Sequence, residues 1–523
     1  MKSRLRFARA LAAAAFLAAA LPLAAQDTAD AKPDAKATPA KEATPTPTPG
    51  PAPSPAVKHN RITIGGKPIA YTATAATIDL KDKKGEPIAR MFSVAYTADG
   101  ADAKQRPVTF AFNGGPGSAS IWLHMGSFSP VRVDSLDGQY TPPPPYKMVE
   151  NSESLLDRTD LVFIDAIGTG FSRIIGKGEP KNFYGTDQDV EAFAQFLQRW
   201  VSANGRWNSP KFLMGESYGT TRAAALLAHL EQRGMAFNGA VLISSYLNAW
   251  DDFAGPAFSS DTPYELYLPT MAAAAWYHKK LDPRPPDLAA FLTEVRQFAL
   301  GEYSQALVLG GKLDETRRGA IAAKLHRYTG LPETYILNAD LRIDPGRFQK
   351  EILRTQRRTV GRLDARFFGI DRDAAGEFPE YDPAGTAIAS AYTAAFNAYV
   401  RDTLGYKTED LYKPFSDEIT EWDDHHKAPA GGKASMPDVA EDLRSVMSVN
   451  PNLKIFSANG YYDFATPFFE TEYTLAHMGL DPSLEKNISF GYYESGHMIY
   501  LHEPALKQLK ADLAKFYDQT MSR

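Results

Sequence analysis

The chain has 523 residues, a formal net charge of −5 and no cysteine. A chain of this length can bury a large core without covalent staples, so the lack of cysteine excludes disulfide bonds but does not exclude an oxidising compartment. The mild charge, with no basic patch in the sequence, argues against nucleic acid or an anionic membrane as a main partner.

The first 25 residues have the layout of a secretory signal peptide. An apolar run over residues 10–20 leads to small residues ending at Ala25, and four basic residues precede it: Lys2, Arg4, Arg6 and Arg9. We therefore expect cleavage near Ala25, a periplasmic or secreted protein, and no stable membrane insertion after cleavage. A retained anchor is the less favoured alternative, because the run is short for a membrane span.

Residues 26–57 are rich in Ala, Pro, Thr and Lys and contain almost no large apolar side chain. Such a segment cannot bury a core, so we expect a disordered linker. Alternating polar and apolar residues over 61–96 then predict β-hairpins. Four short apolar runs separated by helical stretches predict strands of a mostly parallel sheet: Val108–Phe112, Leu161–Ile164, Phe212–Met214 and Ala240–Ser244.

A glycine-rich loop follows the first of these apolar runs. The segment Asn113-Gly114-Gly115-Pro116-Gly117 leaves backbone N–H groups free to face a negatively charged oxygen, as an oxyanion hole requires. A phosphate-binding loop or a plain turn is the alternative. The segment lacks the Lys and Ser/Thr that end a Walker motif, so the oxyanion loop is favoured.

The segment Gly215-Glu216-Ser217-Tyr218-Gly219 has the pattern of a serine nucleophile on a tight strand-to-helix turn. An apolar run of strand length precedes it, and Thr220–Arg233 is rich in Ala and Leu and predicts a helix. The serine would then lie near a helix N-terminus, where developing negative charge is favoured. The pattern alone is weak, since an ordinary tight turn can carry it, so it requires partners elsewhere in the chain.

Residues 251–435 are charged, helix-rich and aromatic. We expect them to form a helical cap over the site. Within this segment, Asp423-Asp424-His425-His426 suggests a metal site, but adjacent residues on a polar loop seldom converge on one ion. We therefore expect a solvated charged loop and no bound metal.

Two polar residues near the C-terminus each follow a predicted strand. The run Leu453–Ala458 leads to Asp463, and a strand predicted over Asn487–Tyr492 leads to His497. A helix is expected between them, over Phe468–Met478.

Ser217, Asp463 and His497 follow one another in the chain order of an α/β-hydrolase triad. Residues 58–250 and 436–523 are accordingly expected to be the two parts of an α/β-hydrolase core. Other histidines are weaker candidates. His502 is a rival for the base but lies outside the Gly-His turn, and for His124, beside the glycine loop, a structural role is favoured over a place in the pocket.

Four motifs resemble the serine carboxypeptidases of peptidase family S10: Asn113–Gly117, Gly168–Ser172, Gly215–Tyr218 and Gly496-His497-Met498. The resemblance extends from about residue 60 to the C-terminus, and Tyr264–Pro269 is more similar to bacterial members than to plant or yeast members. It implies an α/β-hydrolase fold, with helices on both faces of a mostly parallel central sheet and a helical cap insertion.

Acyl-transfer chemistry gives the three triad residues their roles. Ser217 is expected to be the nucleophile, His497 the general base, and Asp463 the group that orients and stabilises the imidazole. The resemblance implies that the oxyanion-hole donors are the N–H groups of Gly115 and Tyr218. It also implies three substrate-binding residues: Asn113, Gly114 and Glu216.

Glu216 narrows the predicted reaction. An acid beside the nucleophile is not needed for ester hydrolysis but can grip the free C-terminus of a peptide, which the family does together with Asn113. Two adjacent carboxylates cannot both ionise cheaply, so we expect Glu216 to share a proton with the substrate and peptide cleavage to favour acidic pH. A solvated or salt-bridged acid is the alternative.

The sequence departs from the family pattern in three places. Ala111 stands where members have a Trp that donates to the substrate carboxylate, so strict exopeptidase action is in doubt. The usual Asp-Gln-Pro is Asp165-Ala166-Ile167, and Ser118 replaces a common Cys.

The sequence thus predicts a serine-type carboxypeptidase that needs no cofactor and acts on peptides with a free C-terminus. An esterase or acyltransferase with the same triad is the first alternative, because Ala111 weakens the argument for peptides. A catalytically silent binding protein with the same fold is the second. Side-chain preferences and the oligomeric state are left open.

Overall fold

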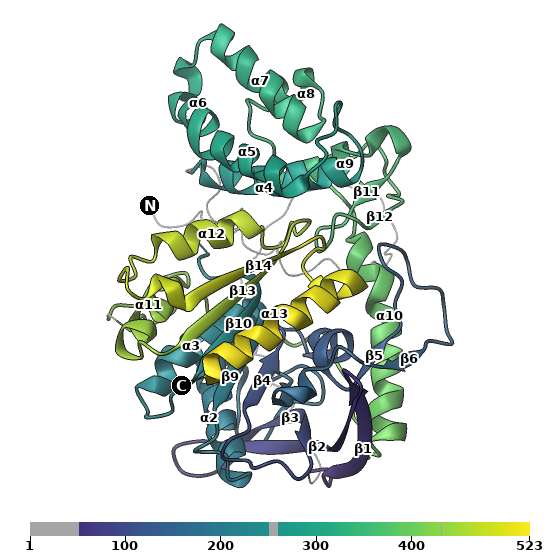
Figure 1. Cartoon of the computed structure of the whole chain (residues 1–523), viewed down its shortest axis with the longest axis vertical. Coiled ribbons are helices and arrows are strands. Elements are labelled where there is room, and N and C mark those ends of the chain that lie inside the picture. The colour runs from purple at the N-terminus through teal and green to yellow at the C-terminus, as the bar shows by residue number, and fades with distance from the viewer. Residues whose placement is uncertain (1–51, 250–259, 430, 523) are drawn as a thin grey trace, which may run out of the picture. The chain divides into compact units, whose positions relative to one another are not determined.

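The computed structural model describes residues 52–249, 260–429 and 431–522 (Figure 1). The predicted signal peptide, and the predicted linker up to residue 51, lie outside the described residues. The first strand, β1, begins at Ala56, within the last residues of the predicted linker. Over the described ranges, no helix is both long enough and apolar enough to cross a membrane.

Within the described chain, a ten-stranded sheet has the order β1-β2-β3-β7-β4-β9-β10-β13-β14, with β8 paired to β3. The first strands pair antiparallel, and the strands from β7 to β14 in this order run parallel. Their bounds are β1 Ala56–Ile64, β2 Lys67–Lys81, β3 Pro87–Ala98, β4 Val108–Phe112, β7 Asp160–Ile164, β8 Arg173–Ile174, β9 Lys211–Ser217, β10 Gly239–Ser245, β13 Lys454–Gly460 and β14 Ile488–Tyr493.

Helices cover both faces of the sheet, as predicted. Buried side chains of the parallel strands alternate between two apolar clusters, because successive residues of a strand point to opposite faces. One cluster is completed by α2 (Thr186–Ala203), α3 (Tyr218–Glu231) and α11 (Ala440–Val449). The other is completed by α10 (Pro383–Ala398) and α13 (Glu503–Met521), which lie along the sheet in Figure 1.

The predicted strands and hairpins are confirmed. All residues of β4, β7 and β10 are buried, which explains why these strands read as continuous apolar runs. The predicted hairpin region corresponds to β1, β2 and β3. Two short elements follow the glycine loop: helix α1 (Ile121–Leu123) and the antiparallel pair β5 (Val131–Val133) and β6 (Met148–Glu150).

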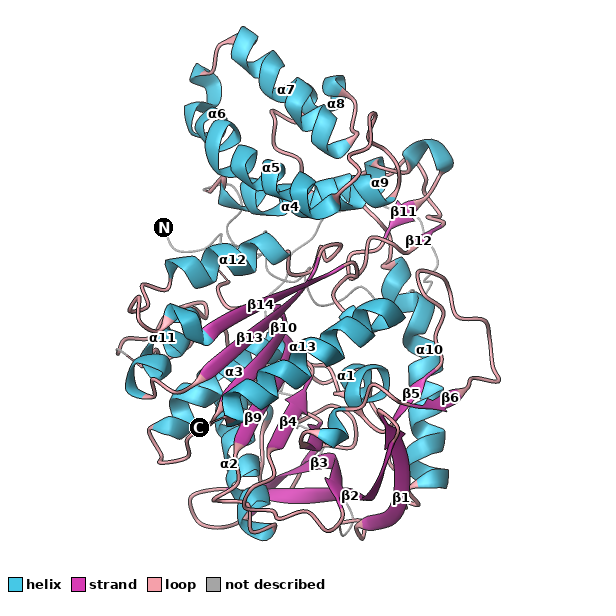
Figure 2. Cartoon of the chain, in the orientation of Figure 1, coloured by secondary structure: helices cyan, strands magenta, loops and turns pink. Residues whose placement is uncertain are grey.

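A layer of helices with its own apolar core lies between the two parts of the sheet in the sequence (Figure 2). It packs on α12 (Phe468–His477) through Phe468 and Phe469. Its helices are α4 Thr262–Tyr277, α5 Leu288–Phe298, α6 Ser304–Leu309, α7 Glu315–Thr329, α8 Glu333–Asn338 and α9 Pro345–Glu351.

The remainder of the predicted cap segment does not belong to this layer. A short hairpin of β11 (Thr359–Val360) and β12 (Phe368–Gly369) ends it, and α10 then packs on the sheet, where Ile388 and Tyr392 join the strand residues in one cluster. The apolar face of α10 is therefore buried by the hydrolase core. The helical layer covers only part of residues 251–435.

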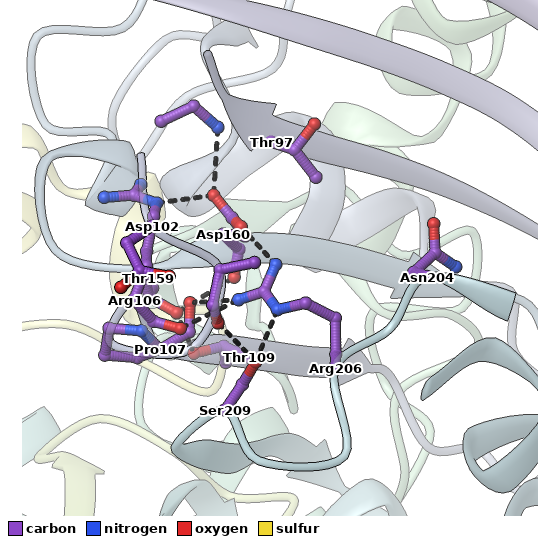
Figure 3. Close-up of polar contacts among 12 residues, drawn as sticks. Thr97, Asp102, Arg106, Pro107, Thr109, Thr159, Asp160, Asn204, Arg206 and Ser209 are labelled. Atoms are coloured by element: carbon purple, nitrogen blue, oxygen red, sulfur yellow. Dashed lines mark hydrogen bonds and ion pairs between the residues drawn. The ribbon is translucent and has the colours of Figure 1, made fainter. Parts of the chain in front are cut away.

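A buried cluster of charges fixes the amino ends of the parallel strands (Figure 3). Asp160, the first residue of β7, accepts hydrogen bonds from the N–H of Ala98 (2.9 Å), from Arg106 Nε (2.6 Å) and from Arg206 Nη1 (2.6 Å). Arg206 also donates to Ser209 Oγ at 2.6 Å. Each carboxylate oxygen thus has a positively charged partner, as a buried ion pair requires.

Candidate active site

Ser217 lies at the sharp turn between β9 and α3. Its backbone angles are φ 61° and ψ −134°, a conformation that costs a non-glycine residue about 1–3 kcal/mol. A Cβ on Gly215 would clash with the carbonyl oxygen of Gly219, so glycine is required there. The predicted strand–turn–helix is confirmed, and α3 begins immediately after the serine, which places the positive end of its dipole there.

The glycine loop after β4 lies directly against this turn. A Cβ on Gly114 would overlap the backbone nitrogens of Tyr218 and Gly219, so only glycine allows the approach. Gly115 has φ +110°, which also favours glycine. The two predicted oxyanion donors, the N–H groups of Gly115 and Tyr218, therefore belong to segments that touch beside Ser217.

Asp463 and His497 are in direct contact, and both are buried. His497 Nδ1 lies 2.8 Å from Asp463 Oδ2. The carboxylate also accepts hydrogen bonds from the N–H groups of Ala465 (2.8 Å) and Thr466 (3.0 Å). A carboxylate can only accept, so Nδ1 donates and Nε2 is left as the proton-accepting nitrogen.

The turn that carries His497 is attached to the strand beside Ser217. In the register of β9 and β10, Ser245 is the partner of Ser217, and Ser244 Oγ donates to the carbonyl oxygen of His497 at 2.7 Å. The end of β13 approaches the same turn so closely that a Cβ on Gly460 would clash with the carbonyl of Gly496. The structure thus brings the segments of the three predicted triad residues to one edge of the sheet.

Glu216 is buried beside Ser217 and has only neutral hydrogen-bonding neighbours. Asn113 Nδ2 donates to Glu216 Oε1 at 2.7 Å, and Oε2 has no hydrogen-bond partner among the described residues. Burial raises the pKa of Glu216 to about 7, despite the opposing effects of His497, Tyr500 and Asn113. At mildly acidic pH the side chain is therefore neutral.

The pKa of His497 is raised by its two acidic neighbours. Burial lowers this pKa, but the charge and hydrogen bond of Asp463 and the charge of Glu216 outweigh that effect. Protonation of Glu216 removes one of these charges. The imidazole is therefore a weaker base, and less readily held as a cation, when Glu216 is neutral.

Residues 362–366 brace the site from the segment between the helical layer and α10. The N–H of His497 donates to the carbonyl of Leu363 (2.6 Å), and the N–H of Phe464 donates to the carbonyl of Arg362 (3.0 Å). Asp364 Oδ2 accepts the N–H of Gly496 (3.2 Å). No motif in the sequence predicts this brace, because main-chain contacts carry no residue signature.

Arg222 of α3 supports the glycine loop from behind. Its fully buried guanidinium donates to the carbonyl of Asn113 (2.6 Å) and pairs with Asp189 of α2 (2.7 Å). The sequence does carry a signal for this support: Arg222 lies within an Ala- and Leu-rich helix, and a charge that such a helix buries must be paired.

The weaker histidine candidates have neighbours other than Asp463 and His497. His124 Nε2 bonds the Tyr96 hydroxyl at 2.7 Å, and burial lowers its pKa to about 3, which supports a structural role. His502 Nε2 lies 3.6 Å from Asp137 Oδ2.

The acidic and histidine run of the predicted cap forms ion pairs. His426 lies between Asp187 (2.8 Å) and Asp442 (2.9 Å); burial lowers its pKa, but these carboxylates raise it to about 9. His425 pairs with Asp423 at 2.6 Å. No group of three or more His, Cys, Asp or Glu side chains in the described ranges is arranged to hold a metal ion.

Residues 80–252 match the serine carboxypeptidase family. This segment carries Asn113, Glu216 and Ser217, and for it the resemblance read from the motifs is confirmed. Asp463 and His497 lie outside the matched residues. Among curated protein sequences, none matches the chain.

Solved structures of hydrolases are similar to this chain. Kex1(Δ)p, a prohormone-processing carboxypeptidase from Saccharomyces cerevisiae, is 16% identical with a TM-score of 0.50, and the match covers 86% of this chain and 91% of that one. The predicted α/β-hydrolase fold is confirmed. A carboxyl esterase from Bacillus coagulans is 10% identical with a TM-score of 0.34, covering 86% and 99% of the two chains. These matches give no support to the bacterial subtype.

Proposed function

We propose that this protein is a serine carboxypeptidase that releases C-terminal residues from peptides through an acyl-enzyme. The observation that carries the proposal is the Glu216 carboxyl, buried next to the nucleophile and bonded to Asn113. A neutral carboxyl group there can hydrogen-bond the free carboxylate of a peptide end. General ester hydrolysis has no need of such a group.

In this mechanism Ser217 Oγ attacks the carbonyl carbon of the last peptide bond, and its proton moves to His497 Nε2. Asp463 stabilises the resulting imidazolium through the 2.8 Å contact. The N–H groups of Gly115 and Tyr218 stabilise the oxyanion by about 3 kcal/mol each. His497 then protonates the leaving amine. Water attacks the acyl-enzyme in the same way, with His497 again as the base, and Ser217 is released.

Peptide cleavage is expected to favour mildly acidic pH. Glu216, with a pKa raised to about 7, carries its proton below that pH and loses it above. Once ionised, it repels the substrate carboxylate and raises the proton affinity of His497. The repulsion slows cleavage of peptides with a free C-terminus as the pH rises.

The test compares an N-acylated dipeptide, its C-terminal amide and an N-acyl amino-acid ester, each between pH 4 and 9. We expect the free acid to be the preferred peptide, with kcat/KM falling above pH 7, and no such fall for the amide. Labelling by a fluorophosphonate probe should be lost in Ser217→Ala. Equal rates for acid and amide would refute the proposal.

An esterase or acyltransferase is the second candidate, because position 111 holds a buried Ala, which offers no hydrogen-bond donor to a carboxylate. Rapid ester turnover without release of amino acids from any peptide would favour it. Failure of the probe to label Ser217 would favour a silent binding protein instead.

We further infer that the protein is exported, as the signal-like residues 1–25 suggest. The proposed subtype is bacterial, and the proposed compartment is the periplasm or the exterior. N-terminal sequencing of the exported protein should find a start near residue 26. A start at Met1 would contradict export by cleavage.

A further inference from the structure

Two buried polar atoms lie together beside Ser217 without a hydrogen-bond partner in the described chain: Glu216 Oε2 and the hydroxyl of Tyr500. Glu216 is 1% exposed and Tyr500 is 4% exposed. The Tyr500 hydroxyl lies near enough to Glu216 to lower the pKa of that carboxyl by hydrogen bonding, but the contact lacks the geometry of a full hydrogen bond. Buried polar groups are nearly always bonded, so a pair of unbonded ones at a candidate site points to a ligand.

The surrounding bonds decide what kind of ligand fits. Asn113 Nδ2 bonds Glu216 Oε1, and Asn113 Oδ1 accepts the N–H of Leu123 at 2.9 Å. Oε1 is thus an acceptor, so the proton of a neutral Glu216 resides on Oε2. Glu216 Oε2 and the Tyr500 hydroxyl are then two donors, and neither has an acceptor among the described residues. Two adjacent donors match the two oxygens of a carboxylate.

We propose that Tyr500 is a further substrate-recognition residue, which donates its hydroxyl hydrogen to one oxygen of the peptide's terminal carboxylate while neutral Glu216 donates to the other. This inference rests on the proposed carboxypeptidase function. Tyr500 supplies a donor in a site where Ala111 provides none. Its place three residues after His497 fixes it to the same turn as the general base.

Of the titratable groups that act most on Glu216 in the described chain, only His497 can carry a positive charge. The titratable groups that act on Glu216 are His497, Asp463 and Tyr500, and Glu216 in turn acts on Tyr392. The proposed recognition depends on hydrogen bonds from neutral donors. It should weaken as Glu216 ionises near pH 7.

The test variant is Tyr500→Phe, which removes the hydroxyl and keeps the ring. The matched control is Tyr406→Phe, because Tyr406 is also buried with an unpartnered hydroxyl but packs against Phe92, 5.0 Å between ring centroids, in the core. Neither hydroxyl makes a well-formed hydrogen bond to another described residue, so both variants are expected to fold and to melt within a few degrees of the wild type.

Each variant is assayed at pH 5.5 with an N-acylated dipeptide and with its C-terminal amide. Tyr500→Phe should lose about 10- to 100-fold in kcat/KM for the acid, mainly through KM, and less than threefold for the amide, as expected for one hydrogen bond to a charged group. Tyr406→Phe should leave both values unchanged. The upper pH limit for the acid should also move upward in Tyr500→Phe, because Tyr500 lowers the pKa of Glu216.

Equal losses on acid and amide, or no loss on either, would overturn the role of Tyr500 and leave the carboxypeptidase proposal standing. If the wild type does not prefer the acid to the amide, the carboxypeptidase proposal itself fails. As a second readout, the free product amino acid should protect the wild type and Tyr406→Phe against thermal unfolding and should protect Tyr500→Phe less. Equal protection of all three would also overturn the inference.

Discussion

The two ends of the parallel strands bury a carboxyl group in opposite ways. At the amino ends, Asp160 is 2% exposed, and Arg106 and Arg206 each donate to one of its oxygens. At the carboxyl ends, Glu216 is 1% exposed, with one oxygen bonded to a neutral amide and the other unbonded. A buried carboxyl group therefore stabilises the fold where cations neutralise it, as at Asp160. A buried carboxyl group that is hydrogen-bonded only to neutral groups, as at Glu216, can respond to pH and to a ligand.

Backbone strain follows the same division. Ser217 and Ser244 both have positive φ, at 61° and 52°, and both lie at the carboxyl ends of neighbouring strands. The amino-terminal cluster is held by side-chain bonds such as that from Arg206 to Ser209. Strain of this kind persists only where the surrounding structure enforces it, and it gathers at functional sites.

Ser217→Gly should give the largest effect. Glycine adopts φ 61° without strain, so we expect the variant to gain about 1 kcal/mol of stability while kcat falls by about 10⁵-fold or more. The matched change at the other end is Ser209→Gly, which removes the partner of Arg206 and should lower stability without changing kcat. Peptide assays give kcat and urea unfolding gives the stability of both variants. A loss of stability in Ser217→Gly would contradict the view that strain is stored at Ser217.

Asp160→Asn tests the structural end of the comparison. The buried guanidinium of Arg206 and the partly buried one of Arg106 would lose their countercharge, so we expect a loss of about 3–5 kcal/mol in the free energy of unfolding. The value of kcat/KM per folded molecule should stay within about twofold of the wild type. A large fall in kcat/KM with unchanged stability would show that this cluster serves the active site.

Glu216→Gln should have an effect on stability that depends on pH. The folded pKa of about 7 lies above the ordinary 4.5, so the unfolded chain loses its proton first and the wild type loses stability as the pH rises from about 4.5 to 7. Gln has no proton to lose. The variant should therefore gain up to about 3 kcal/mol relative to the wild type at pH 8, and nothing at pH 4.

The activity of the same variant gives a second reading. Peptide cleavage by Glu216→Gln should extend to higher pH, because Gln stays neutral and can still bond a carboxylate. Urea unfolding and kcat/KM profiles at pH 4, 6 and 8 measure both effects. Parallel stability profiles for variant and wild type would mean that Glu216 is not held neutral by burial.

Thr466→Val should have the smallest effect. The Thr466 hydroxyl donates to Asp463 Oδ2 at 2.8 Å, on the oxygen that also bonds His497. Removing it should misalign the acid and lower kcat about three- to tenfold with little change in KM. Thr466→Ser keeps the hydroxyl and is expected to retain most of the activity. Equal activity of the Val and Ser variants would show that the hydrogen bond from Thr466 to Asp463 does not contribute to catalysis.

The sequence by itself determined the elements and the positions of the predicted site residues. Fully buried strands such as β4 and β10 read as apolar runs, and Gly114 and Gly215 mark places where a Cβ has no room. These are local constraints, and local constraints leave residue signatures. The carboxyl ends of parallel strands share one edge of a sheet. The positions of Ser217, Asp463 and His497 after predicted strands therefore placed all three at that edge.

Only the tertiary structure decided what surrounds those residues. It packed α10 on the sheet and not with the helical layer, and it laid Leu363 against the backbone of His497. It also placed the Tyr500 hydroxyl near Glu216 Oε2, and neither atom makes a well-formed hydrogen bond to a described residue. Main-chain bonds, the choice of packing partner and the satisfaction of a polar atom depend on residues distant in the sequence. A local pattern cannot encode them.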